Sequence, residues 1–169
     1  MPNPTLPPAV REVLFVCTGN SCRSVMAEYL FNKMAADKGL SVRAHSAGVA
    51  APQGSGPSFE TLEVLKLDGI DARRHSSRMV HEDMMESSDM VLALTEQHAA
   101  HLKRHFPENE SKVYLMTEFY AGDDRALFIQ GIPDPIGMNH HFYKNTYLVI
   151  RACVDTLVKQ LAAAGKKSS

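Results

Sequence analysis

A short turn between residues 17 and 24 carries the side chains best suited to catalysis. Successive backbone N–H groups in a tight loop can converge on one oxyanion, and the N-terminus of a helix that follows adds partial positive charge. Arg23 supplies a planar guanidinium that matches two oxygens of a tetrahedral oxyanion. Gly19 lets the loop turn. We therefore expect a phosphate-binding loop made of Thr18, Gly19, Asn20, Ser21, Cys22 and Ser24 together with Arg23.

Cys17 lies at the base of this predicted loop and is the candidate nucleophile. The thiolate is the reactive form of cysteine and positive surroundings favour it, so we expect Cys17 to be ionised at neutral pH. Ser24 can donate its hydroxyl to that thiolate. A thiolate beneath a bound phosphoryl group is in line with the leaving group. This arrangement predicts transfer of the phosphoryl group to sulfur, followed by hydrolysis.

Other uses of the same turn fit the sequence less well. A zinc site could use Cys17 and Cys22, but the remaining cysteine, Cys153, lies in the last predicted helix and no histidine is near the first two. A nucleotide-binding loop would need Gly-Lys-Ser or Gly-Lys-Thr, and the sequence contains neither.

Three histidines offer another possible metal site. His98, His101 and His105 share a helix face at spacings of three and four residues. No carboxylate or cysteine lies among them, so a solvated helix face is the better interpretation. We expect neither a metal nor a cofactor.

Alternating strands and helices must position the turn. The unbroken apolar run at 13–16 predicts a strand buried on both faces, and apolar residues recurring every four positions predict a helix over 24–38. Four such units form an α/β sandwich with a parallel sheet, because each crossover helix must bury its apolar stripe. Ligands in such folds bind at the carboxyl ends of the strands, which favours the turn. The other predicted strands span 41–45, 90–94 and 112–115; the other helices span 58–67, the segment from the Thr95 cap to about 105, and a last helix striped by Tyr147, Ile150, Val154, Leu157, Val158 and Leu161.

The chain has the length and composition of one globular domain. Its 169 residues are 44% hydrophobic and 22% charged, which is too apolar for disorder and too charged for a membrane protein. We expect residues 1–11 to form a flexible arm, residues 12–164 a single domain and residues 165–169 a frayed tail.

The charge balance and the absence of targeting signals bear on which partners the chain binds. The 18 Lys and Arg residues nearly balance the 19 Asp and Glu residues, so no overall field recruits nucleic acid or acidic lipid. No apolar run approaches the roughly 18 residues that a membrane span needs. The start lacks a secretory signal, and three cysteines are too few for a disulfide scaffold. We expect a cytoplasmic protein that binds neither nucleic acid nor membrane.

The sequence closely resembles the low-molecular-weight protein tyrosine phosphatase family over nearly all of residues 12 to 161. Cys17, Arg23 and Ser24 match the family's Cys, five residues, Arg and Ser or Thr. The resemblance implies a three-layer, flavodoxin-like α/β sandwich with a four-stranded parallel sheet, and implies that Asn20, Ser46 and His75 hold the phosphate loop in shape. Further matches are Met26-Ala27-Glu28, Ser46-Ala47-Gly48, His75-Ser76-Ser77-Arg78 and Asp89.

A second family signature, Asp134-Pro135, lies in a loop spanning 131–137. The chemistry needs an acid there, because an alkoxide, phenoxide or guanidine leaves poorly unless it is protonated as it departs. The same carboxylate can then take a proton from the attacking water. We expect Asp134 to be the general acid.

Cys22 follows Cys17 by five residues on the same loop. In the family, a second cysteine at this place can form a reversible disulfide with the nucleophile. An accessible thiolate is the group most exposed to oxidants, and a neighbouring thiol gives it a recoverable state. We favour this redox role over that of a small buried residue beneath the loop.

The walls of the pocket decide which phosphoryl group is cleaved. The resemblance implies hydrolysis of phosphotyrosine in a protein, with aryl phosphates also cleaved and inorganic phosphate released. Ser21 keeps the hydroxyl of the Thr found in the family's arginine phosphatases, and Ile136-Gly137 resembles their loop, so a protein arginine phosphatase is the alternative. An arsenate reductase or a catalytically silent phosphoprotein-binding module fits less well. Aromatic residues that could add a wall to the pocket are Phe119, Tyr120 and Phe128.

Overall fold

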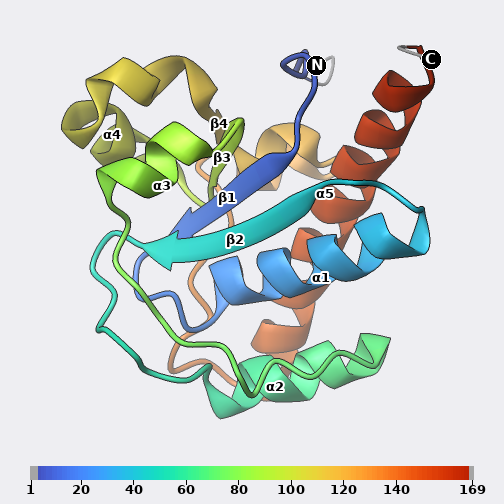
Figure 1. The fold of residues 1–169 in the computed structure, drawn as a ribbon. Helices are drawn as coiled ribbons and strands as arrows, with labels where there is room; N and C mark the ends of the chain where they lie inside the picture. Colours follow the sequence, from blue (N-terminus) through green and yellow to red (C-terminus); the bar gives the residue numbers. More distant parts are fainter. Residues whose placement is uncertain (1–3, 168–169) are drawn as a thin grey trace.

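A four-stranded parallel sheet forms the middle layer of the computed structural model, which describes residues 4–167 (Figure 1). The strand order is β2-β1-β3-β4, and every neighbouring pair is parallel. This arrangement confirms the predicted fold class. The strands are β1 (Glu12–Cys17), β2 (Arg43–Gly48), β3 (Met90–Ala93) and β4 (Val113–Leu115).

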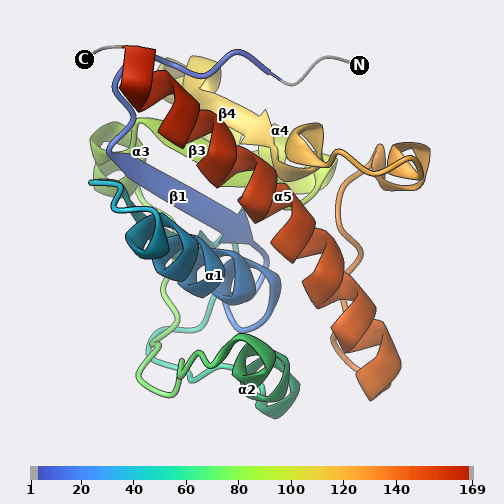
Figure 2. The same ribbon diagram turned by 90° about the vertical axis from the view of Figure 1, so that its right-hand side faces the viewer.

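Both faces of the sheet are covered by helices, as the apolar run at 13–16 predicts (Figures 1 and 2). Val13 and Phe15 of β1 face a core shared with α1 and α5, whereas Leu14 and Val16 face a second core with α3 and α4. Successive side chains of a strand point to opposite faces, so one short run serves both cores. The helices are α1 (Arg23–Asp37), α2 (Phe59–Leu65), α3 (Glu82–Ser87), α4 (Glu96–His105) and α5 (His140–Lys167), with short 3-10 segments η1 (Lys66–Asp68), η2 (Pro107–Lys112), η3 (Met116–Phe119) and η4 (Arg125–Phe128).

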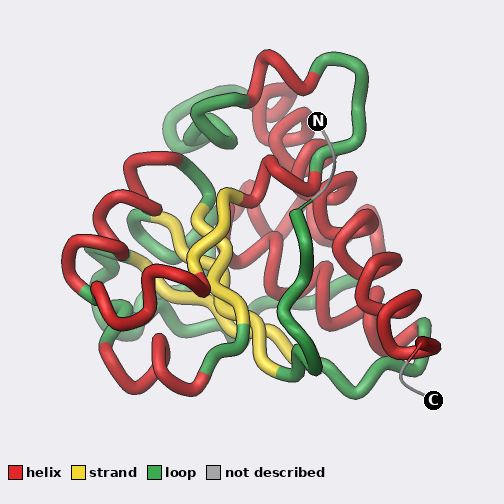
Figure 3. The backbone as a smooth tube through the Cα atoms, turned by 90° about the horizontal axis from the view of Figure 1, so that it is seen from above, coloured by secondary structure: helices red, strands yellow, loops and turns green. Residues whose placement is uncertain are grey.

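Two elements differ from the sequence prediction. β2 lies at residues 43–48 rather than 41–45, because its register with β1 places Gly48 opposite Cys17. α3 was not predicted, since its six residues are too short to show a helical period. Seen from above, the strands lie in the centre with helices on either side of them (Figure 3).

The two ends of the chain pack more closely than expected. Leu6 and Val10, in the arm predicted to be flexible, are partly buried against the core. The backbone N–H groups of Arg11 and Glu12 donate to Asp89 at 2.7 and 2.9 Å. At the other end α5 continues to Lys167, into the segment expected to be a tail, while residues 1–3 and 168–169 lie outside the described residues. Of the helices in residues 4–167, none is long and apolar enough to cross a membrane.

The carboxyl end of β1 is the point where the chain direction across the sheet reverses, because β2 lies on one side of β1 and β3 on the other. A later loop crosses the neighbouring strand end: Gly131 pairs with Thr95, and the Ile132 N–H donates to the Leu94 carbonyl at 2.8 Å. Gly131 has φ +109°, and a Cβ there would lie 2.4 Å from Thr95 Cα. Glycine is therefore required for this crossing.

Gly131→Ala should lower the free energy of unfolding by about 3 kcal/mol or more, since it combines an unfavourable φ with a backbone clash. Gly69→Ala is the matched control: Gly69 also has a positive φ, +70°, but a Cβ there meets nothing within 4 Å. The control should cost about 1 kcal/mol. Urea unfolding of both variants measures the difference, and equal losses would show that the crossing tolerates a side chain.

Candidate active site

The loop that joins β1 to α1 places the Cys17 sulfur next to the Ser24 hydroxyl. Cys17 Sγ lies 2.9 Å from Ser24 Oγ, and both residues are buried. The end of β2 supports the loop from one side, because the backbone N–H of Val49 donates to the Cys17 carbonyl at 2.9 Å. Gly48 allows this approach: a Cβ there would lie 2.3 Å from the Thr18 carbonyl oxygen. The nucleophile candidate and its hydroxyl partner are therefore brought together as predicted.

Asn20 determines the turn of the loop. Its φ is +53°, a left-handed conformation that asparagine tolerates better than most residues, whereas Gly19 is not among the positive-φ glycines. The fully buried Asn20 amide donates to Ser24 Oγ and to Ser46 Oγ, each at 2.9 Å. Its Oδ1 accepts from the backbone N–H of Arg78 at 3.1 Å. The left-handed residue of the turn is thus Asn20 rather than Gly19, which was expected to let the loop turn.

His75 and Ser46 lie beside the loop, where the family resemblance places them. His75 Nε2 donates to the Asn20 carbonyl at 3.1 Å, and His75 Nδ1 lies 3.7 Å from the Glu28 carboxylate. The Ser46 hydroxyl donates to the same carboxylate. A supporting role for Glu28 was not predicted, although its place four residues after Ser24 puts both side chains on one face of α1.

Arg23 joins the loop to the segment that carries Asp134. The buried guanidinium donates through Nη1 to the Ile132 carbonyl at 2.9 Å, and its Nη2 lies 3.1 Å from Asp134 Oδ2. Asp134 is 44% exposed, and its other oxygen accepts from the Ile136 N–H at 3.1 Å. A carboxyl group from residue 134 is therefore held over a loop that begins at residue 17.

Cys22 is buried at the start of α1 among hydroxyl groups. Its Sγ lies 3.3 Å from Ser58 Oγ and 3.6 Å from the Tyr143 hydroxyl. Burial, and then the contact with Cys22, raise the pKa of Tyr143. Ser58 also caps α2, and Thr61 in that helix donates to the Ser21 carbonyl at 3.1 Å. All three cysteines of the chain are free thiols.

The specificity candidates Ser21 and Ile136 are more exposed than Cys17 and Arg23. Ser21 is partly buried, and the Ile136 side chain is 56% exposed. Phe119 is buried in the core and unavailable as a pocket wall. Tyr120 and Phe128 pack edge to face with ring centres 5.1 Å apart, so these two rings contact each other.

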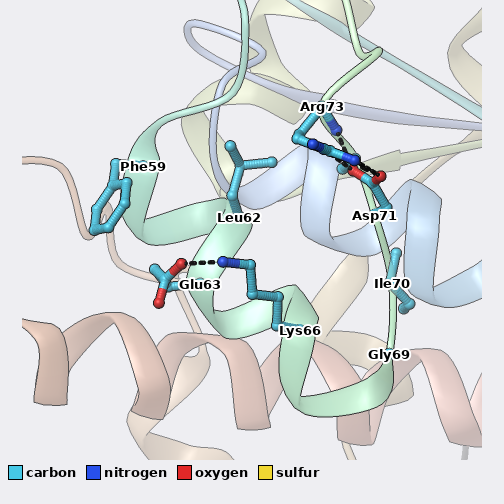
Figure 4. A pocket seen from close by; sticks show the side chains of 9 residues that line it. Phe59, Leu62, Glu63, Lys66, Gly69, Ile70, Asp71 and Arg73 are labelled. Atoms are coloured by element: carbon cyan, nitrogen blue, oxygen red, sulfur yellow. Dashed lines mark hydrogen bonds and ion pairs between the residues drawn. The ribbon is translucent and has the colours of Figure 1, made fainter.

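A shallow groove of about 410 Å³ begins at Phe59, the residue after Ser58, and runs between α2 and the segment 69–73 (Figure 4). Phe59, Leu62 and Ile70 contribute apolar side chains to it, and Phe59 is 71% exposed. Its charged residues pair with each other, Lys66 with Glu63 and Arg73 with Asp71. The groove holds no unpaired charge and no thiol, so the reactive groups remain at the phosphate loop.

The predicted solvated histidine face is wrong at His98, which is only 5% exposed. His101 and His105 stack on the outer side of α4 with ring centres 4.0 Å apart. Within residues 4–167 no cluster of three or more His, Cys, Asp or Glu side chains could hold a metal ion. Cys153 is buried as expected, and burial raises the pKa of its thiol to about 12, which makes it a poor member of a thiol relay.

Comparisons with known proteins identify the family of the chain. Residues 12–167 match the family described as low molecular weight phosphotyrosine protein phosphatase. The chain is 37% identical over 156 residues to a protein-arginine-phosphatase of Bacillus subtilis, covering 92% of this chain and 97% of the relative. It is 31% identical over 160 residues to the low molecular weight protein-tyrosine-phosphatase YfkJ of the same organism, covering 92% and 96%.

A solved structure of the YwlE arginine phosphatase, a cysteine-to-serine mutant with a phosphorylated active site serine, superposes with a TM-score of 0.81. The two chains are 35% identical over 89% of this chain and 95% of that one. The matched region includes the phosphate loop and the loop of Asp134. The chain therefore belongs to the low molecular weight phosphotyrosine protein phosphatase family and is a phosphatase.

Proposed function

We propose that the chain is a cysteine-dependent protein phosphatase that works through a phosphocysteine intermediate and releases inorganic phosphate. The observation that carries the proposal is the 3.1 Å contact between Arg23 and Asp134, which holds a carboxyl group over the loop of Cys17. An oxyanion binder, a nucleophile and an acid at one place suffice for phosphoryl transfer. A module that only binds phosphoprotein would need neither the nucleophile nor the acid.

In the first proposed step, Cys17 sulfur attacks phosphorus. The S–P bond forms as the bond to the leaving group breaks, and the Asp134 carboxyl gives its proton to the departing atom. Arg23 and the N–H groups of residues 18–23 hold the phosphoryl oxygens. Ser24 donates to the sulfur whenever it carries negative charge, which its 2.9 Å contact with Cys17 permits.

In the second proposed step, water attacks the phosphorus of the intermediate. The Asp134 carboxylate takes the proton of the water, the S–P bond breaks, and inorganic phosphate and the Cys17 thiolate result. The relative with a phosphorylated active site serine supports covalent transfer to the nucleophile position. Asn20, Ser46 and His75 act in this proposal by holding the loop, through the contacts that join them.

Phosphoarginine in a protein is the substrate class we favour. A guanidine group has several N–H donors, for which the hydroxyl of Ser21 and the exposed carboxyl of Asp134 are suitable acceptors. The relative named protein-arginine-phosphatase supports this choice. Phosphotyrosine is the second candidate, because the exposed side chain of Ile136 could pack on a phenyl ring and a relative is named a tyrosine phosphatase.

Cys22 belongs to the same proposal as a redox partner. A peroxide would remove two electrons and two protons from Cys17 and Cys22, leaving a disulfide that a cellular thiol can reduce again. The disulfide protects Cys17 from irreversible oxidation. Cys22 lies on the loop of Cys17, and both are free thiols in this structure.

Cys17→Ser should lower turnover of p-nitrophenyl phosphate by more than about a thousandfold and leave phosphate binding intact. Asp134→Asn should lower kcat/KM on phenyl phosphate by about a hundredfold, and less on p-nitrophenyl phosphate, because nitrophenolate needs less protonation to leave. Asp37→Asn, in an exposed pair with Lys33 on α1, is the control and should behave as wild type. Full activity of Cys17→Ser would overturn the mechanism.

Substrate class is tested with one peptide carrying either phosphoarginine or phosphotyrosine. The wild type should have the higher kcat/KM on phosphoarginine, with Cys17→Ser as the blank. Ser21→Ile removes the hydroxyl and adds apolar bulk, so it should shift the ratio toward phosphotyrosine by about tenfold or more. Ser21→Thr, which keeps the hydroxyl, should retain the wild-type ratio. A wild-type preference for phosphotyrosine would make the second candidate the correct one.

A further inference from the structure

His98 is a buried polar side chain that the proposed reaction does not use. It lies in the first turn of α4 and is 5% exposed, whereas its neighbours His101 and His105 lie further out. Both of its ring nitrogens have partners: Nε2 lies 2.8 Å from Thr18 Oγ1, and Nδ1 lies 3.0 Å from Thr95 Oγ1. A neutral imidazole donates from one nitrogen and accepts at the other, so it can bond both hydroxyls at once.

One of these partners belongs to the phosphate loop. Thr18 directly follows Cys17 and is itself exposed, yet its hydroxyl contacts the buried ring of His98. This contact reaches across 80 residues of sequence. The backbone carbonyl of Thr18 is held separately, by the N–H of Ala50 at 3.0 Å. The backbone of Thr18 thus bonds the segment that follows β2, and its side chain bonds α4.

The other partner belongs to the strand end that carries the acid loop. Thr95 pairs with Gly131, and the neighbouring N–H of Glu96 donates to the Gln130 carbonyl at 3.0 Å. From there the chain runs through Ile132, whose carbonyl accepts from Arg23, to Asp134. His98 therefore connects the residue next to the nucleophile with the base of the loop that holds the acid.

We propose that His98 is a positioning residue that sets the separation of Cys17 and Asp134 by tying Thr18 to Thr95. The inference rests on the proposed phosphatase mechanism, in which both groups act on one phosphoryl group. A rigid link at this place keeps the acid within reach of the leaving atom while the sulfur attacks. Misplacement of a reacting group by about 1 Å can cost on the order of a hundredfold in rate.

The ring performs this task in its neutral form. Burial, and next the charge of Arg23, lower the pKa of His98 to about 4. His101 acts in the same direction and Asp134 in the opposite one. Because the imidazole carries no charge near neutral pH, an amide side chain can replace it without changing the charge of the site.

This pKa makes stability depend on pH. The unfolded chain protonates His98 near its ordinary pKa of about 6.5, but the folded chain only near 4, so stability due to the neutral ring is full above pH 6.5 and is lost as the pH falls toward 4. Lowering the pH from 7 to 5 should lower the Tm of wild type by about 4 °C more than that of His98→Gln. Equal losses in thermal scans would contradict a neutral, buried His98.

The positioning role is tested with three variants at His98. Gln places its amide where Nε2 lies and can keep the bond to Thr18, while the backbone N–H of residue 98 still donates to Thr95 Oγ1 at 3.3 Å and so keeps Thr18 tied to Thr95. Asn places its amide near Nδ1 and keeps the side-chain bond to Thr95 but loses Thr18, and Leu keeps neither side-chain bond. The readout is kcat/KM on phenyl phosphate and on p-nitrophenyl phosphate. The kcat/KM of His98→Asn and His98→Leu should fall by about tenfold on p-nitrophenyl phosphate and by about fiftyfold on phenyl phosphate, because the acid is less needed for nitrophenolate to leave. The kcat/KM of His98→Gln should stay within about threefold of wild type on both substrates.

Thr18→Val removes the Thr18–His98 hydrogen bond from the side of the exposed Thr18, without altering α4. Its kcat/KM values on the two substrates should match those of His98→Asn. The double variant should be no worse than either single one, because both remove one interaction. A purely structural His98 would lower activity on both substrates by one factor, and that result, or wild-type activity of His98→Asn, overturns the inference. If Cys17→Ser retains turnover, the proposed mechanism itself fails, which is a separate outcome.

Discussion

The buried amide of Asn20 is the interaction on which the site depends. The phosphate loop can converge its N–H groups only if one residue turns left-handed, and that conformation is costly for a residue with a side chain. Asn20 offsets the cost because its amide bonds Ser24, Ser46 and the backbone of Arg78 in a fully buried place. Ser46 and Arg78 come from other parts of the chain, so the loop has its shape only when the domain is folded.

The fold supplies a second constraint, which is the meeting of two neighbouring strand ends. β1 leads into the phosphate loop and β3 leads into α4, and in a parallel sheet both ends lie at the same edge. Gly131 lets the acid loop pass against the end of β3 at backbone contact distance. Arg23 then spans the remaining gap with one guanidinium. Asp134, the proposed acid, is thereby held in place by the backbone contacts of its loop and by Arg23, although its side chain is exposed.

Sequence reasoning succeeded where a local pattern depends on contacts between residues close together in the chain. The apolar run before Cys17, the spacing of Cys17, Arg23 and Ser24, and the cap at Thr95 each describe contacts within a few residues, and the structure contains them. It failed where partners are distant. The bounds of β2 follow from its pairing with β1, and the inward turn of His98 follows from a hydroxyl 80 residues away. Helical spacing alone places three histidines on one face and cannot tell which of them is covered.

Within the proposed mechanism, the residues of the phosphate loop differ strongly in burial from Ile136, the exposed specificity candidate. Cys17, Arg23 and Asn20 are almost inaccessible, so a change at any of them disturbs several contacts at once. The Ile136 side chain is 56% exposed, so we expect its replacement to leave the phosphate loop intact. A buried phosphate loop beside an exposed side chain would let the proposed phosphoryl-transfer site accept leaving groups as different as a phenol and a guanidine. In the proposed function, the choice of substrate depends on Ser21 and Ile136, so the residues at these two positions are a better guide to the substrate than overall identity to a relative.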